Sequence, residues 1–152
     1  MRFLYSLLVL FVILFYSCDD KPCYEEMNTY FKIGFYQVKN GNVSDSILDS
    51  LKIYADQSNF VLAKKKARFI YPELSPHSDT TLFFLNVNNN VGDDYIRIGY
   101  NRKYHLVSHD CGFLTFFDNI KILEHSTTFI DSVVVENSSV NDVNQEQIKI
   151  YL

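Results

Sequence analysis

Residues 30–36, which read Tyr-Phe-Lys-Ile-Gly-Phe-Tyr, are the stretch that decides the fold of this chain. Phe31, Ile33 and Phe35 are apolar, whereas positions 30, 32 and 36 carry tyrosine or lysine. Successive side chains of a β-strand point to opposite faces, so a period of two indicates one buried face and one solvated face. The sequence therefore predicts a strand that packs on one side against an apolar core.

Segments of the same kind recur along the rest of the chain at spacings of about 8–15 residues, and no long helical period interrupts them. The abundance of phenylalanine, tyrosine and β-branched residues also favours strands, and Asn40-Gly41 is a strong turn signal after the first one. We predict an all-β fold, an antiparallel β-sandwich of the immunoglobulin-like or a similar type. The further strands expected are 50–55, 60–63, 67–71, 80–87, 95–100, 104–108, 113–117, 120–123, 129–136 and 147–152.

Two polar triplets separate expected strands. Asn101-Arg102-Lys103 is interpreted as the turn of a hairpin. Lys64-Lys65-Lys66 indicates either a solvated turn or a strand edge that charge protects against pairing with another chain.

The first 17 residues have the organisation of an export signal. Arg2 supplies the positive charge, residues 4–16 form an apolar run and Ser17 is small. The run is shorter than the roughly 20 residues of a spanning helix. Cys18 follows directly, an arrangement that resembles a bacterial lipobox, in which the cysteine is acylated after cleavage. An uncleaved N-terminal anchor and a signal cut elsewhere are the alternatives.

This interpretation divides the chain into three parts. Residues 1–17 are the lipoprotein signal peptide, a signal helix that is cleaved, and residues 18–28 are the lipid anchor and tether. Residues 29–152 are the β-sandwich domain. We expect the protein to be lipid-anchored in the cell envelope, at the outer membrane, on its periplasmic face or at the cell surface, with palmitate on Cys18.

Composition limits the classes of partner. Without residues 1–17 the chain has 13 Lys and Arg, which is the 14 of the sequence minus Arg2, against 18 Asp and Glu, so its formal charge is −5. This charge argues against nucleic acid as a partner and against general electrostatic binding to anionic lipid. Membrane contact is instead expected through the N-terminal lipid.

Cys23 and Cys111 are the cysteines that remain once Cys18 is acylated. In an oxidising envelope such a pair is a candidate disulfide, which would close a loop of almost ninety residues and stabilise the fold by up to roughly 4–5 kcal/mol. Two free buried thiols are the alternative.

Residues that could carry catalytic or metal chemistry cluster between positions 105 and 110. His105 and His109 would lie roughly 13 Å apart on one strand, too far to share a metal ion. Ser108-His109-Asp110 contains the three residue types of a hydrolase triad, but neighbouring side chains of a strand point to opposite faces. We expect neither a metal nor a catalytic site here, and no cofactor.

The loop after the 80–87 strand offers oxygen atoms that a calcium ion could bind. Asn88, Asn90, Asp93 and Asp94 fall within seven positions, but they lack the regular spacing of a dedicated calcium loop. A plain hairpin loop, with Gly92 at a positive φ, is the alternative that we favour.

Four tripeptides match the Asp-Ser/Thr-apolar acceptor of Bacteroidetes O-glycosylation, and each would place a bulky glycan at an exposed position. An Asp-Ser pair can equally begin a strand, which is the structural alternative. The candidate acceptors are Ser46, Ser50, Thr80 and Ser132.

The chain as a whole resembles a family of small Bacteroidetes lipoproteins catalogued only as a domain of unknown function. The resemblance implies an envelope location and a β-rich fold, and it implies no activity. Asp19-Asp20 also resembles the acidic tags that send some such lipoproteins to the cell surface. The segments that carry the family resemblance are Cys23, 31–36, 71–76, 79–81, 107–113 and 147–150.

We therefore expect an envelope lipoprotein that is a non-catalytic binding or scaffolding module, with another envelope protein or a glycan as its partner. This hypothesis predicts an exposed aromatic patch on one face. The alternative is a small envelope enzyme with an unrecognised active site, which would require a cleft with converging polar groups.

Overall fold

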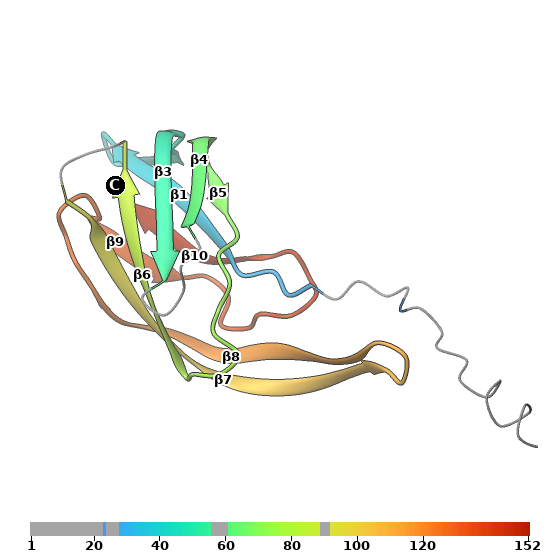
Figure 1. Ribbon diagram of the computed structural model, residues 1–152. Coiled ribbons are helices and arrows are strands. Elements are labelled where there is room, and N and C mark those ends of the chain that lie inside the picture. Colours follow the sequence, from blue (N-terminus) through green and yellow to red (C-terminus); the bar gives the residue numbers. More distant parts are fainter. Residues whose placement is uncertain (1–22, 24–27, 56–60, 89–91) are drawn as a thin grey trace, which may run out of the picture.

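Ten β-strands and no helix form the described part of the computed structural model, which comprises residue 23 and residues 28–55, 61–88 and 92–152 (Figure 1). The all-β prediction is confirmed, whereas the signal helix predicted for residues 1–17 lies outside the described residues. The strands are β1 Lys32–Lys39, β2 Asn42–Asp45, β3 Leu48–Ala55, β4 Val61–Ala67, β5 Phe69–Ile70, β6 Thr80–Val87, β7 Asp94–Ser108, β8 Gly112–His125, β9 Ser132–Val135 and β10 Glu146–Tyr151.

The strands form two five-stranded sheets. Sheet A has the order β2-β1-β10-β9, with β5 also paired to β1, and sheet B has the order β4-β3-β6-β7-β8. All pairs are antiparallel except β1 with β10, which run parallel, so the predicted antiparallel sandwich is corrected at this one pair. A parallel pair needs a long connection, and nearly the whole described chain lies between these two strands.

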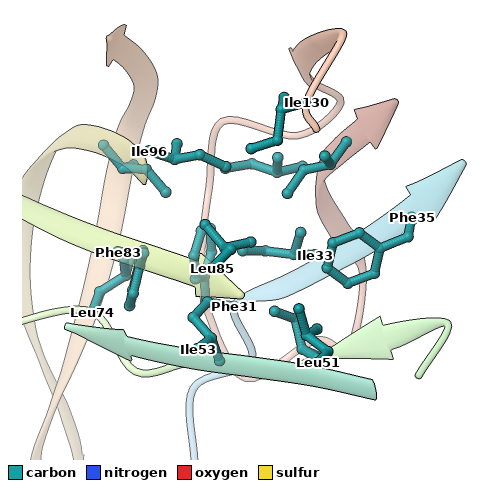
Figure 2. Packing of buried hydrophobic residues seen from close by; sticks show 14 of the residues in the cluster. Phe31, Ile33, Phe35, Leu51, Ile53, Leu74, Phe83, Leu85, Ile96 and Ile130 are labelled. Atoms are coloured by element: carbon teal, nitrogen blue, oxygen red, sulfur yellow. The ribbon is translucent and has the colours of Figure 1, made fainter. Parts of the chain in front are cut away.

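Residues 30–36 behave as their alternation predicts. Phe31, Ile33 and Phe35 are at most 2% exposed and face the inner side of sheet B. Figure 2 shows them packed against Leu51 and Ile53 of β3 and against residues of β6. Burying such side chains stabilises the fold by about 1.5–3 kcal/mol each, so this stretch contributes strongly to the core.

Asn40-Gly41 forms the predicted turn between β1 and β2. Their φ angles are 53° and 77°, and Lys39 pairs with Asn42 across the turn. Two central residues with positive φ form a type I′ turn, whose twist matches that of the flanking strands.

The predicted turn at residues 101–103 is wrong, because β7 continues through these residues to Ser108. Asn119, with a φ of 55°, lies in an irregular part of β8, which likewise continues where the sequence suggests a break. The polar triplet is tolerated within a strand because Arg102 and Lys103 form ion pairs with Asp79 and Asp118 near the surface. The two long strands form a hairpin whose outer part extends away from the sandwich (Figure 1). Residues 101–118 are called the arm below, and Phe117 is buried at its base.

The lysine run also lies inside a strand. Residues 64–66 belong to β4, which is an edge strand of sheet B, so the solvated-turn alternative is wrong and the edge-strand alternative is confirmed. Lysines at a sheet edge disfavour pairing with a second chain.

Candidate binding surfaces

The most exposed aromatic side chains of the described residues lie on the arm. Tyr104 and Phe113 are 70% and 67% exposed, and Leu106 is 46% exposed. Leu106 pairs with Phe113 across the strands, and Tyr104 lies two residues before Leu106, so all three share one face. We call these three residues the arm-tip cluster. By the same alternation this face continues the inner face of sheet B, where Phe117 is buried.

Cys111 lies in the turn at the end of the arm and is joined to Cys23. The two Cα atoms are 4.8 Å apart, and the sulfur atoms lie at disulfide distance, which supports the predicted pairing. The Cys111 amide donates a hydrogen bond to the Ser108 hydroxyl at 3.1 Å, which helps to close the turn. The bridge therefore holds Cys23 at the end of the arm.

The histidines and the serine of the arm do not converge. His105 stacks on Phe116 with ring centroids 4.6 Å apart. The Ser108 hydroxyl accepts a hydrogen bond from the Cys111 amide. His109 and Asp110 are exposed in the turn. Within the described ranges, no three His, Cys, Asp or Glu side chains are grouped so that they could hold a metal ion.

A second group of aromatic rings lies at one end of the outer face of sheet A, where Tyr71 is exposed and Tyr30 and Phe69 are half-buried. The Lys32 ammonium lies 4.2 Å from the Phe69 ring centroid, and the Arg68 guanidinium lies 4.6 Å from it. Tyr30 contacts Tyr71 edge to face at 6.4 Å, and Lys32 is also 5.9 Å from the Tyr71 centroid. We call these five residues the A-face cluster, in which cations and aromatic rings attract each other.

The same face continues to a tyrosine–carboxylate pair. The Tyr36 hydroxyl lies 2.9 Å from both carboxylate oxygens of Glu146, and burial together with this hydrogen bond raises the pKa of Tyr36. A Cβ atom at Gly34 would collide with Glu146, so glycine is what lets the carboxylate cross β1. Lys149 lies 5.7 Å from the Tyr36 ring and pairs with Glu136 at 3.0 Å.

Rings also line the outer face of sheet B. Tyr54 stacks on Phe84 at 5.2 Å, and Tyr95 pairs with Phe84 across the next strand. The aromatic residues of the described part are thus distributed over the arm and both outer faces. The predicted patch on one face stays a prediction, for which the A-face cluster is a candidate. Alternation in three strands places Tyr54, Phe84 and Tyr95 outward, which the sequence pattern could have revealed.

The two aspartates after β6, Asp93 and Asp94, form hydrogen bonds with different parts of the fold. Asp93 accepts hydrogen bonds from Tyr54 at 2.5 Å and Asn86 at 2.8 Å on the exposed side, whereas Asp94 is fully buried. The Asn88 side-chain oxygen accepts the Ser50 amide at 3.3 Å, and Asn90 lies outside the described residues. These side chains therefore have partners within the fold, and Gly92 has the positive φ, 101°, that the hairpin-loop alternative predicts.

Asp94 is a structural carboxylate that the sequence pattern did not reveal. Its carboxylate accepts a hydrogen bond from the Ser126 hydroxyl at 2.6 Å. It also accepts hydrogen bonds from the backbone amides of Thr128, Phe129 and Ile130 at 3.0, 2.6 and 3.0 Å. Burial raises its pKa, but the hydrogen bonds from Ser126, Phe129 and Thr128 outweigh burial, and the pKa is lowered. Residues 129–131, which were predicted as strand, instead form a loop around this carboxylate, and β9 begins at Ser132.

The four candidate glycosylation residues differ in exposure. Thr80 and Ser132 are exposed at the first positions of β6 and β9, where a bulky group would meet no core. Ser46 and Ser50 are half-buried, and Ser50 lies within β3. Exposure therefore favours Thr80 and Ser132, and glycosylation stays a prediction.

The signal peptide predicted for residues 1–17 and the acylation predicted at Cys18 fall outside the described residues. In the part of the chain that the structure describes, no helix has both the length and the apolar character needed to cross a membrane.

Comparison with known proteins assigns the chain to a family. The searches of curated proteins and of solved structures found no match. A sequence-family model described as a family of unknown function, DUF6452, matches residues 50–152, from β3 to the end of the chain. This match includes the arm and sheet B but begins after β1 and β2. Because it spans more than half of the sequence, the chain belongs to the DUF6452 family of unknown function.

Proposed function

We propose that the protein is a cell-envelope lipoprotein anchored through acylated Cys18. The apolar run of residues 4–16, the small Ser17 and the cysteine that follows support this proposal. The pairing of Cys23 with Cys111 gives independent support, because disulfides persist in oxidising compartments such as the bacterial envelope.

We further propose that the anchored domain is a non-catalytic binding or scaffolding module and that the A-face cluster is its binding surface. The observation that carries this proposal is the set of rings and cations gathered around Phe69. Tyrosine, phenylalanine and arginine are enriched where proteins bind each other. Another envelope protein is therefore the favoured partner, with a glycan as the alternative outcome of the test.

Three carboxylates of the described residues have structural roles in the fold. Asp93, Asp94 and Glu146 each accept hydrogen bonds from neighbouring groups of the fold. A general acid or base needs a carboxyl group that faces substrate. The three carboxylates instead fix loops and side chains within the domain.

Capture from envelopes with the lipid anchor intact tests the binding proposal. The double substitution of Lys32→Ala with Tyr71→Ala is expected to reduce recovery of the cross-linked partner at least about tenfold, because hot-spot residues each contribute about 1–2 kcal/mol or more. The matched control is Lys52→Ala with Tyr54→Ala, a lysine and a tyrosine from the outer face of sheet B.

The two variants separate the outcomes of this capture. Loss of the partner in the sheet A variant alone supports the A-face cluster, and recovery of a polysaccharide instead of a protein identifies the ligand as a glycan. Equal recovery from the wild type and the sheet A variant, or loss in the sheet B variant alone, would show that the A-face cluster is not the binding surface.

A further inference from the structure

We infer that the end of the arm lies on the membrane surface, where the arm-tip cluster enters the lipid interface as a second contact beside the anchor. This inference rests on the proposed acylation of Cys18. The arm-tip cluster is distant from the anchor in the sequence, and the partner inferred for its exposed apolar face is a lipid bilayer.

The covalent path from the lipid to the arm is short. Cys18 and Cys23 are five positions apart, and a fully extended chain of that length spans at most about 18 Å. The disulfide then places the Cys111 Cα atom 4.8 Å from that of Cys23. Any conformation of the tether therefore keeps the turn of the arm within about 23 Å of the acylated residue.

The exposed side chains of the arm-tip cluster have the chemistry of a membrane-interface contact. Phe113 lies two residues after Cys111, and Leu106 pairs directly with it. Tyr104 joins them on the same face, with 70% of its surface exposed. Aromatic rings that are apolar with a polar tip favour the membrane–water interface, and an exposed apolar cluster marks an interaction site.

The charges of the arm agree with this orientation. Arg102 and Lys103, nearer the sandwich, are paired with Asp79 and Asp118. The end of the arm carries Asp110 and no lysine or arginine within residues 104–117. Contact would therefore depend on apolar burial rather than on attraction to anionic headgroups, and vesicles of zwitterionic lipid are the appropriate probe.

The arm also sets the distance between the membrane and the sandwich. Phe117 is buried in the core, and Tyr100 contacts it edge to face at 5.1 Å, so the base of the arm is fixed to the domain. Gly112, at the tip end of β8, lies five residues before Phe117, which corresponds to about 17 Å of strand. Contact through the tip would hold the sandwich away from the bilayer and leave the A-face cluster accessible.

Depth-dependent fluorescence quenching tests the inference, because the sequence contains no tryptophan. The Phe113→Trp variant is purified as the full lipoprotein and reconstituted into phosphatidylcholine vesicles whose acyl chains are brominated. Val134→Trp is the matched control, since Val134 is 44% exposed on the outer face of sheet A. Leu106→Trp, across the strands from Phe113, repeats the test at a second arm position.

The expected result is about a twofold or greater loss of emission for both arm variants and little loss for the control, because interfacial side chains reach about 5–10 Å into the bilayer. Intact mass first establishes whether Cys18 is acylated. An unacylated protein would overturn both the anchor and this inference. If the protein is acylated and bound to vesicles but the arm variants are quenched no more than Val134→Trp, the inference alone is overturned. The same holds if the emission of the arm variants shifts without quenching, because a second protein copy then covers the arm-tip cluster instead of lipid.

Discussion

Replacing Asp94 by asparagine is expected to lower the free energy of unfolding by about 3–5 kcal/mol. The carboxylate accepts hydrogen bonds from one hydroxyl and three backbone amides in a site that solvent does not reach. An asparagine of the same shape offers a single acceptor oxygen and turns its amide hydrogens toward other donors. Buried N–H groups would then lose their partners, which is costly in a low dielectric.

Denaturant unfolding under non-reducing conditions measures this effect. Asp93→Asn is the matched control, because Asp93 is the adjacent aspartate and is exposed. We expect the control to cost less than about 1 kcal/mol, as is usual for exposed hydrogen bonds and ion pairs. A cost at Asp94 no larger than that at Asp93 would show that the loop 126–130 does not depend on this carboxylate.

The same residue predicts how stability depends on pH. Because the pKa of Asp94 is lowered in the fold, the unfolded chain takes up this proton at a higher pH than the folded chain. The contribution is therefore complete above the unfolded value of about 3.9 and is lost as the pH falls through the folded value. The unfolding free energy of Asp94→Asn should fall less steeply between about pH 5 and pH 2 than that of the wild type.

Removing residues 148–152 is expected to abolish folding. These residues form most of β10, which pairs with β1 on one side and β9 on the other and carries two fully buried isoleucines, Ile148 and Ile150. Truncating each isoleucine to alanine alone costs about 2–5 kcal/mol, and a domain of this size is stable by only about 5–15 kcal/mol.

Soluble yield and circular dichroism of the truncated chain check this result. Removal of Leu152 alone is the control, because it deletes one backbone hydrogen bond to Tyr36 and leaves β10 in place. A truncated chain with normal yield and a native β spectrum would contradict the central place of β10 in sheet A.

The sequence pattern identified the elements whose signals are local. The alternation over residues 30–36 predicted β1, and Asn40-Gly41 predicted its turn. The parallel pairing of β1 with β10 was not predictable, because alternation defines the buried face of a strand but not the direction of its neighbour. The polar triplet at 101–103 suggested a turn because its ion-pair partners, Asp79 and Asp118, are distant in the sequence and no local pattern reveals them.

The candidate surfaces were predictable to different degrees. Cys23 and Cys111 follow from the number of cysteines and the expected compartment. The A-face cluster was only partly accessible, because it combines alternate residues of β1 with residues 68–71, which lie far along the chain. Nothing local distinguishes buried Asp94 from exposed Asp93, since the difference arises from how the loop at 126–130 folds back.

Metabolic labelling with a palmitate analogue tests directly whether Cys18 is acylated. The comparison is between the wild type and Cys18→Ala, which retains Cys23 and Cys111 and therefore the disulfide pair. We predict that the wild type is labelled and that label is absent from the variant. Equal labelling of the two proteins would contradict acylation at Cys18, and with it the envelope anchor and the membrane contact of the arm.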